Sequence, residues 1–566
     1  MKSAIKNLLT LILPALLISS CGKSKKTADV LIPGNAAMVF HINAASLSSK
    51  LSWNEIKNSD WFKMASKEGP EDEFAKKILD DPENSGIDLK GDMYFFIQMH
   101  GSDAYMVFQG KLKDGAVFET TVKKIAKHRE VKKDGNLNYA ADDKGCVSWN
   151  KDRFIVVFNS ENFMGMRNQF GGRKRSVITE DSILNYAKQL YSLKKSNSIG
   201  DDSRFASLLD EKGDMHFWFN AGLYMQGLMP MGLGDLFKAT SLMQGNVTGY
   251  TMNFDNGKIT ASSKSWYNKE LVSFMKKYKP GNINTDMLKR ISGQNVSMVI
   301  AMNYPPEGLK EFMKLLGVDG VVNGFMGRIG FSLDDFVKAN KGDLLFAVSD
   351  FTVQDKTITY DYGGLEPYSY TSSKPDAKIL FATSINDKPS FDKMVDILQN
   401  EIGKEGQTEE LDKIKYSIKD NWFVAGNAQD AVDGFAAGNK TDHAFISKIS
   451  GHPMGGYIDI QKILGGIQTK KADNFKTVLS GGGNIWDNII FYGGDLKDGA
   501  HTGYFEINMI DKNTNSLKQF NNFISTLAKS ARNERENDMS ERDYPKMKDI
   551  EVALPPPMHD TIKSSH

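Results

Sequence analysis

The sequence has few cysteines and almost no net charge. Only Cys21 and Cys146 occur among 566 residues, and 71 Lys and Arg residues stand against 70 Asp and Glu residues. A chain of this length buries enough apolar surface to fold without disulfides, and two cysteines cannot form a disulfide framework. The balanced charge provides no basic field that would attract a polyanion. At roughly 150 residues per domain, we expect a globular protein of several domains that does not bind nucleic acid.

Recognisable catalytic and metal-binding motifs are also missing. The nine histidines are scattered, with no His-Glu-x-x-His motif, and there is no Cys-x-x-Cys motif. The nearest match to a phosphate-binding loop, at 480–484, lacks the lysine that should follow it. Cys146 lies in a strand-like segment without a nearby histidine, which indicates a buried thiol rather than a nucleophile. We therefore expect no metal, no cofactor and a noncatalytic role; an enzyme whose site assembles from dispersed residues is the alternative.

Long hydrophobic runs are missing after the N-terminus. Lys2 and Lys6 precede an apolar stretch at 8–18, which is followed by two serines and Cys21. The stretch is shorter than the ~20 residues of a membrane-spanning helix, and its order of charges and apolar residues is that of a secretory signal. The segment that ends at Cys21 resembles a bacterial lipobox, which implies a cleaved signal peptide at 1–20, an acylated Cys21 and a polar tether at 21–30. A plain signal peptide with a chance cysteine is the alternative.

Strand-like and helical periodicities alternate along the rest of the chain. Short strands joined by turns that contain Asp and Gly, such as the turn at 255–257, predict β-hairpins with single helices between them. Few strands are separated by one helix alone, so antiparallel sheets are favoured over a doubly wound parallel sheet. The sequence predicts an α+β fold of mainly antiparallel sheet with helices packed on one face.

The same order of predicted elements occurs twice. Gly91 matches Gly342 at the start of a strand, and the hairpin turn at Gly257 matches the turn at Gly499. This recurrence predicts an internal duplication, whereas two unrelated α+β domains are the alternative. A ligand site in the cleft between the lobes would follow. The predicted parts are an N-terminal lobe at 31–280, a C-terminal lobe at 285–530 that repeats it, and a disordered tail at 531–566.

One stretch is unusually rich in methionine, glycine and bulky apolar residues. It contains Met225, Met229, Met231 and Phe237. Methionine surfaces adapt to varied apolar partners, so these four residues are candidate contacts for an apolar ligand or an envelope protein. Thioethers also bind Cu(I), and an irregular loop buried between the lobes is the purely structural alternative.

The mature chain as a whole resembles a known family. The lipobox at Cys21, the opening Ile-Pro-Gly-Asn-Ala-Ala at 32–37 and the later Gly-Asp strand openings resemble Bacteroidota lipoproteins of the domain of unknown function 4836 family. The resemblance implies no activity, cofactor or catalytic residue. Lysines rather than acidic residues follow Cys21, which within that phylum favours the periplasmic face of the outer membrane over the cell surface.

Two functions of different classes remain open. The first is a lipid-anchored envelope lipoprotein that binds or scaffolds an envelope partner or an apolar ligand. The second is an envelope hydrolase. A pocket lined by convergent polar groups would favour the enzyme, and an apolar groove would favour binding.

Overall fold

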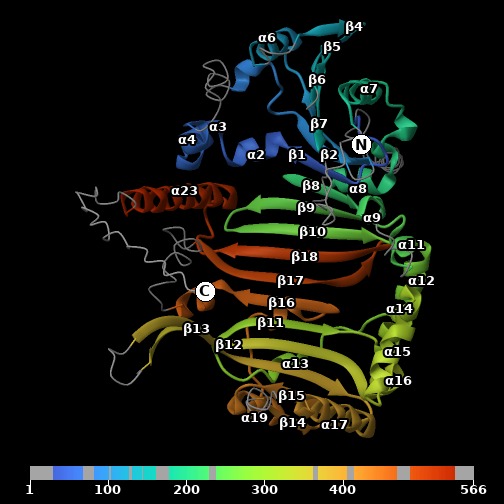
Figure 1. Cartoon of the computed structure of the whole chain (residues 1–566), viewed down its shortest axis with the longest axis vertical. Helices are drawn as coiled ribbons and strands as arrows, with labels where there is room; N and C mark the ends of the chain where they lie inside the picture. Colours follow the sequence, from blue (N-terminus) through green and yellow to red (C-terminus); the bar gives the residue numbers. More distant parts are fainter. Residues whose placement is uncertain are drawn as a thin grey trace, which may run out of the picture.

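One large antiparallel sheet forms the centre of the protein. The computed structural model describes residues 30–67, 82–100, 103–125, 130–142, 145–160, 178–228, 238–360, 368–404, 414–467 and 485–541. Within these ranges, the strands form a single eighteen-stranded sheet, and helices stand at both ends of its central strands (Figure 1). The predicted α+β class is confirmed.

Ten strands build the first half of the sheet. They are β1 (Met38–Asn43), β2 (Asp92–His100), β3 (Asp103–Lys111), β4 (Lys132–Asp134), β5 (Leu137–Ala141), β6 (Gly145–Trp149), β7 (Arg153–Ser160), β8 (Met215–Asn220), β9 (Val247–Asp255) and β10 (Lys258–Trp266). Antiparallel pairing arranges them in the order β4-β5-β6-β7-β3-β2-β1-β8-β9-β10.

The second half continues the sheet through the pairing of β10 with β18. Its strands are β11 (Val296–Asn303), β12 (Asn340–Tyr360), β13 (Tyr368–Ile385), β14 (Lys415–Lys419), β15 (Trp422–Gly426), β16 (Met454–Asp459), β17 (Trp486–Lys497) and β18 (Ala500–Met509). Their order is β18-β17-β16-β11-β12-β13-β15-β14.

The two halves follow the same strand order. Without β4 and β5, the first half reads β6-β7-β3-β2-β1-β8-β9-β10 outside to inside, and the second reads β14-β15-β13-β12-β11-β16-β17-β18. Gly257 and Gly499 occupy the last turn of each half, with φ of 68° and 77°. Both turns need a left-handed residue, which is why glycine occurs in each. That the halves are copies of one unit stays a prediction.

The halves meet at equivalent strands. Ser262 of β10 and Tyr504 of β18 are Cα partners. They lie five positions after Gly257 and Gly499 respectively (262 − 257 = 504 − 499 = 5). The local two-fold axis of this antiparallel pair therefore passes between two residues that hold the same place in their halves.

One face of the sheet, which we call the core face, carries the two main hydrophobic cores. Val39 and Phe96 lie on it in the first half, and Val299 and Leu345 lie on it in the second. Each core is completed by helices whose apolar residues recur at helical spacing, such as Ile183, Ala187 and Leu190. The helices on this face are α7 (Glu180–Tyr191), α8 (Ser203–Asp210), α13 (Thr285–Lys289), α19 (Gln429–Ala436) and α20 (Ile446–Ile449).

We call the opposite face the open face. Among the hydrophobic core clusters of the described residues, those in which helices pack on this face lie at its two outer ends. At one end α6 (Gly115–Ile125) packs on Phe154 of β7, whereas the next residue, Ile155, belongs to the core face. At the other end α17 (Lys388–Lys404) contributes Phe391, which packs against Phe423. Helices therefore pack on both faces, and the prediction of helices on one face is wrong, because β7 alternates two apolar sets that each need a cover.

Further helices line the two ends of the central strands. At one end stand α2 (Ala44–Lys50), α3 (Trp53–Asn58), α4 (Asp60–Lys67) and α23 (Ser516–Glu541); at the other stand α12 (Lys269–Lys277), α14 (Pro306–Leu316), α15 (Asp319–Arg328) and α16 (Leu333–Ala339) (Figure 1). Shorter elements are α9 (Ala221–Leu228), α11 (Ala239–Met243), α21 (Ile460–Gly466) and 3-10 helices at Pro82–Ser85, Lys195–Asn197 and Ile199–Asp201.

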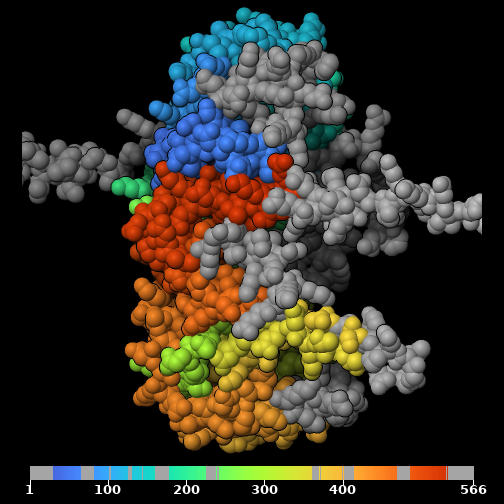
Figure 2. Space-filling model, turned by 90° about the vertical axis from the view of Figure 1, so that its left-hand side faces the viewer, coloured from blue at the N-terminus to red at the C-terminus, as the bar shows by residue number. Residues whose placement is uncertain are grey.

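The last helix ties the C-terminal half to the N-terminal half. Trp61 Nε1 donates a hydrogen bond to Asn521 Oδ1 at 2.8 Å, and Lys518 pairs with Glu55 at 2.7 Å. Seen from this side, the blue N-terminal helices and the red α23 form one continuous surface (Figure 2). The helix runs to Glu541, past the lobe boundary that the sequence predicted at 530; residues 542–566 lie outside the described part of the chain.

Candidate functional site

The middle of the open face is apolar across most of the sheet. Because side chains alternate between faces, residues that pair in register line up in rows across the strands. One row consists of Met93, Ile42, Met215, Met252, Ala261, Phe505, Phe491, Gly456, Ile300, Phe346 and Phe381. The adjacent row consists of Phe108, Phe95, Phe40, Phe217, Tyr250, Ser263, Gly503, Gly493, Met454, Met302, Leu344 and Thr383. Neither row contains a charged residue.

Four large apolar side chains in these rows are exposed to solvent near the centre of the sheet. The exposed fractions are 40% for Tyr250, 36% for Met252, 39% for Met454 and 39% for Phe505. Single exposed apolar residues are common on protein surfaces, whereas a contiguous group of them marks an interaction site. These four residues and the rows around them define the apolar patch of the open face.

Glycines lower the floor of the apolar patch. Between Tyr250 and Met454 the row passes through Ser263, Gly503 and Gly493, so no large side chain stands there. The aromatic rings beside this stretch are packed on one another; for example, the ring centroids of Phe217 and Tyr250 are 5.7 Å apart. The middle of this row is therefore lined by small side chains, with packed aromatic rings beside it.

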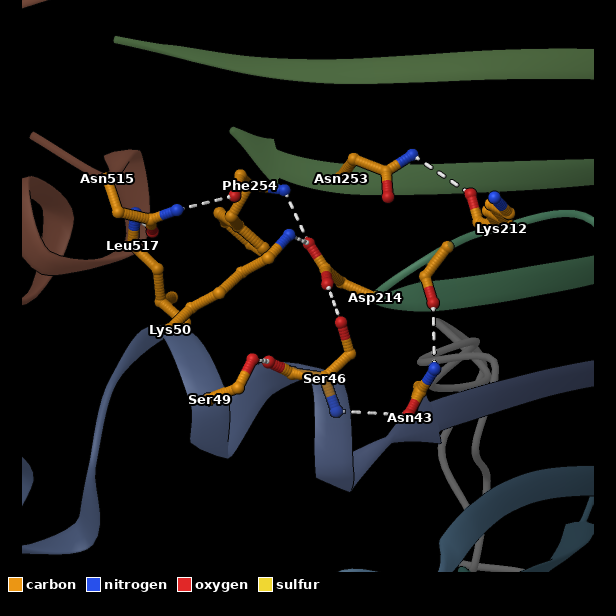
Figure 3. A network of polar contacts seen from close by, with 11 residues as sticks. Asn43, Ser46, Ser49, Lys50, Lys212, Asp214, Asn253, Phe254, Asn515 and Leu517 are labelled. Atoms are coloured by element: carbon orange, nitrogen blue, oxygen red, sulfur yellow. Dashed lines mark hydrogen bonds and ion pairs between the residues drawn. The ribbon is translucent and has the colours of Figure 1, made fainter. Parts of the chain in front are cut away.

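A buried polar network closes one margin of the sheet. Asp214, which is 1% exposed, accepts hydrogen bonds from the backbone N–H of Phe254 at 2.6 Å and from Ser46 Oγ at 2.6 Å, and it pairs with Lys50 at 2.5 Å (Figure 3). Asn515 donates to the carbonyl of Phe254 at 2.8 Å. These contacts join α2, β9 and the start of α23, so they hold the marginal helices against the end of the sheet.

The core face is polar where the two halves meet. Lys264 and Thr251 both donate to the carboxylate of Glu211, which follows α8. On the other side of the junction, Glu506 accepts from Tyr504 at 2.7 Å and from Lys258 at 3.0 Å. We call these residues, together with Ser262 and Thr260 between Lys258 and Lys264 on β10, the junction cluster.

Stacked rings extend the junction cluster into the second half. The ring centroids of Tyr504 and Tyr492 are 5.0 Å apart, and those of Tyr492 and His452 are 3.9 Å apart. His452 Nδ1 lies 2.6 Å from a carboxylate oxygen of Asp495. Burial and the neighbouring carboxylate of Glu506 raise the pKa of Tyr504. Burial alone would raise the pKa of Glu506 too, but its hydrogen bonds outweigh burial and hold that pKa below its usual value.

A pair of buried histidines lies on the core face of the first half. His41 Nδ1 and His216 Nδ1 are 2.9 Å apart, and both residues are 2% exposed. His41 Nε2 lies 3.2 Å from Asp92, and His216 Nε2 lies 3.2 Å from the carbonyl of Glu211. These contacts cross-link β1, β2 and β8, which is a structural role in the centre of the first half.

The described residues contain no group of side chains placed to hold a metal ion, and Cys146 is buried. No group of three or more His, Cys, Asp or Glu side chains comes close enough to hold a metal ion in this part of the chain. Cys146 is fully buried on the core face, as the sequence predicted. The apolar patch was missed in the sequence analysis, although strands with large apolar residues on both faces, such as Met215-His-Phe-Trp-Phe219 in β8, were a signal that could have indicated it.

The residues singled out in the sequence fall mostly outside the described ranges. Met225 belongs to α9, but its side chain is among those that the structure does not describe. Met229, Met231, Phe237 and the proposed lipidation site Cys21 lie outside the described residues. Their predicted roles stay predictions.

Comparison with known proteins identifies the family but not an activity. A family model described as a domain of unknown function, DUF4836, matches residues 29–436, which is more than half of the chain. The protein therefore belongs to the DUF4836 family. Among curated proteins, no sequence matches it.

Solved structures resemble parts of the chain only slightly. Crystal forms III, I and IV of TP0453 give TM-scores of 0.24, 0.23 and 0.24 at 12% sequence identity, and they cover 45%, 46% and 46% of this chain and 87%, 89% and 90% of theirs. This likeness is too slight to support an argument about function. Within the described residues, no helix is both long enough and apolar enough to span a membrane.

Proposed function

We propose that the protein is a noncatalytic binder of lipid acyl chains, and that the apolar patch of the open face is its binding surface. The observation that carries the proposal is the pair of register rows, which cross eleven strands from β2 to β13 without a charged residue. At about 4.8 Å per strand spacing, these rows are roughly 50 Å long. Burial of each CH₂ group on such a surface contributes about 0.8 kcal/mol.

The chemistry of the patch favours acyl chains over a protein segment. A peptide laid on the patch would bury its own amide groups, and each such group without a hydrogen-bond partner is costly. The sheet's backbone groups already pair within the ladder, and hydroxyls in the two rows are confined to Tyr250, Ser263 and Thr383. An acyl chain has no polar groups to satisfy, and the low floor at Gly503 and Gly493 suits a thin ligand.

The proposed setting is the cell envelope. We propose that Cys21 carries the lipid anchor and that the chain is attached to the outer membrane, on its periplasmic face. The lipobox-like segment at the N-terminus supports this proposal. An anchor of two or more acyl chains would hold the apolar patch close to a source of lipid.

We also propose that the two halves arose by duplication of one α+β unit. Their common strand order and the pairing of equivalent strands support this proposal. Each half would then supply one half of the apolar patch: Tyr250 and Met252 come from the first, and Met454 and Phe505 come from the second.

A fatty-acid titration with three variants tests the binding function. A dansyl-labelled fatty acid is added to the wild-type protein and to Met252→Asp, Phe505→Asp and Val117→Asp; Val117 is 40% exposed on α6, which packs at the outer end of the open face, away from the four exposed residues at the centre of the patch. A carboxylate within the patch would lose its hydration when an acyl chain covers it, so the first two variants should bind at least tenfold more weakly. Val117→Asp should bind like the wild type. Equal binding by all four proteins, or no binding by the wild type, would refute the proposal.

A further inference from the structure

The core face at the junction of the two halves forms a second surface feature that lipid binding does not use. Ser262, at the centre of this face of β10, is exposed although it lies in the middle of the sheet. Side chains that share its face are the polar Thr260 and Lys264 on the same strand, Thr251 across β9 and Tyr504 across β18. Short hydroxyl-bearing residues thus make a floor, and one aromatic ring stands beside it.

Helices of the two hydrophobic cores lie on opposite sides of this floor. Helix α8 belongs to the first core and packs near β8 and β9, and α20 belongs to the second and packs near β16 and β17. Three strands separate β9 from β16, which corresponds to about 19 Å at the usual strand spacing. The segments that follow these helices reach toward the junction from both sides: Glu211 binds Lys264, and His452 covers Tyr492.

The floor is occupied unequally on the two sides of the local two-fold axis. On the second half, Tyr504 and Tyr492 fill the row with two stacked rings. On the first half, the same row continues with Ser262 and Thr251, whose side chains are far smaller. One face of Tyr504 is covered by Tyr492, while its partner on the other side, Ser262, is too short to cover the ring. Thr251 is buried beneath Glu211, whereas Ser262 is exposed. From this exposure and from the small size of Ser262 we infer room for a ring above Ser262.

The charges around this room cancel in pairs. Lys264 pairs with Glu211 on one side of Ser262, and Lys258 pairs with Glu506 on the other. An ionic ligand would find no net charge to attract it, and an apolar ligand would have to cover hydroxyl, ammonium and carboxylate groups without replacing their hydration. A neutral ligand that both donates and accepts hydrogen bonds fits this surface.

We propose that the junction cluster is a binding site for a neutral saccharide. One sugar ring lies above Ser262 with its C–H face against the ring of Tyr504, and its hydroxyls exchange hydrogen bonds with Ser262, Thr260 and the Lys264–Glu211 pair. The aromatic platform supplies apolar contact, and the surrounding donors and acceptors fix orientation, as in small-ligand sites generally. This site lies on the opposite face of the sheet from the apolar patch.

The test is a glycan array followed by calorimetry on designed variants. The full-length protein is screened on an array of neutral hexose oligosaccharides beside their sulfated and uronic-acid counterparts, and the strongest neutral binder is titrated calorimetrically. Ser262→Tyr places a second tyrosine ring in the position proposed for the sugar, so it should abolish binding. The ring of Tyr504 and the Lys264–Glu211 pair remain in this variant. Tyr504→Ala should weaken binding at least tenfold, and Tyr504→Phe, which keeps the ring, should weaken it only a few-fold.

Tyr416→Ala serves as the matched control, because Tyr416 is a tyrosine 48% exposed on the outer strand β14. It should bind like the wild type. Each variant is also tested with the dansyl-labelled fatty acid, whose binding should not change, so the two sites can fail separately. The proposal is overturned if no neutral saccharide binds, if only charged saccharides bind, or if Ser262→Tyr binds like the wild type.

Discussion

Replacement of Asp214 tests whether the marginal helices are held to the sheet by one buried carboxylate. The side chain is 1% exposed and receives three contacts, from the Phe254 N–H, the Ser46 hydroxyl and the Lys50 ammonium, at 2.6, 2.6 and 2.5 Å. Asp214→Ala would leave a buried N–H without an acceptor and a partly buried ammonium without a counter-charge. Removal of one partner from a buried pair costs about 3–5 kcal/mol, and a lost buried acceptor costs about 1–3 kcal/mol.

We therefore expect Asp214→Ala to lower the free energy of unfolding of this region by about 3–5 kcal/mol. Ser46→Ala, which removes only one neutral donor, should cost about 1 kcal/mol. The double variant Asp214→Ala/Lys50→Met should cost less than the sum of its single variants, because the second change removes the ammonium that the first leaves unpaired.

Hydrogen exchange is the appropriate assay, because a chain of this size need not unfold in one step. Exchange of the Phe254 amide and of peptides from α2 reports local opening at this margin directly. The reasoning is refuted if the free energy of local opening of these amides in Asp214→Ala lies within about 1 kcal/mol of the wild-type value. It is also refuted if the effects of the Asp214 and Lys50 substitutions are additive.

Three other predictions concern the N-terminal helices, the thiol and one strained turn. The hydrogen bond from Lys518 lowers the pKa of Glu55 to about 2 from 4.5, so this half-exposed pair stabilises the fold above pH 4.5 and loses its effect as the pH falls toward 2. Glu55→Gln should cost under about 1 kcal/mol at pH 7 and nothing at pH 2 in urea titrations; a cost that grows toward low pH contradicts this. Cys146 should resist iodoacetamide in the native protein and react after denaturation, and rapid native labelling would show that it is not buried. Gly342 has a φ of +107°, and an added Cβ would lie 1.9 Å from the carbonyl oxygen of Tyr304, so Gly342→Ala should lower stability by at least about 2 kcal/mol; an unchanged melting temperature would refute this.

Local features of the fold could be predicted from the sequence. The Asp-Asn-Gly segment that ends at Gly257 forms the expected hairpin turn because glycine tolerates its positive φ. Residues 267–295, around the predicted boundary near 280, contain α12 and α13 but no strand; the division into lobes itself stays a prediction. These features depend on residues close in sequence, which is why patterns find them.

Features that depend on distant pairing could not be predicted. The register of Ser262 with Tyr504 joins residues 242 positions apart (504 − 262 = 242), and no local pattern encodes it. The apolar patch could not be predicted for the same reason, since Met252 and Phe505 are brought into one row only through that register. Methionine-rich composition drew the prediction to Met225 and its neighbours, whereas the exposed Met252 and Met454 lie singly in strands of mixed composition.

The pairing of β10 with β18 has a consequence for assembly. The outermost strands of the sheet carry lysines, at Lys132 and Lys133 in β4 and at Lys415 and Lys419 in β14, and such charges discourage edge-to-edge aggregation. The strands β10 and β18, at the inner edge of each half, need no such protection because they pair with each other. Either half produced alone would expose a nine- or ten-residue edge whose natural partner is its own counterpart. A separated half should therefore self-associate into a dimer through that edge or aggregate, whereas in the single chain the two inner edges are already paired with each other.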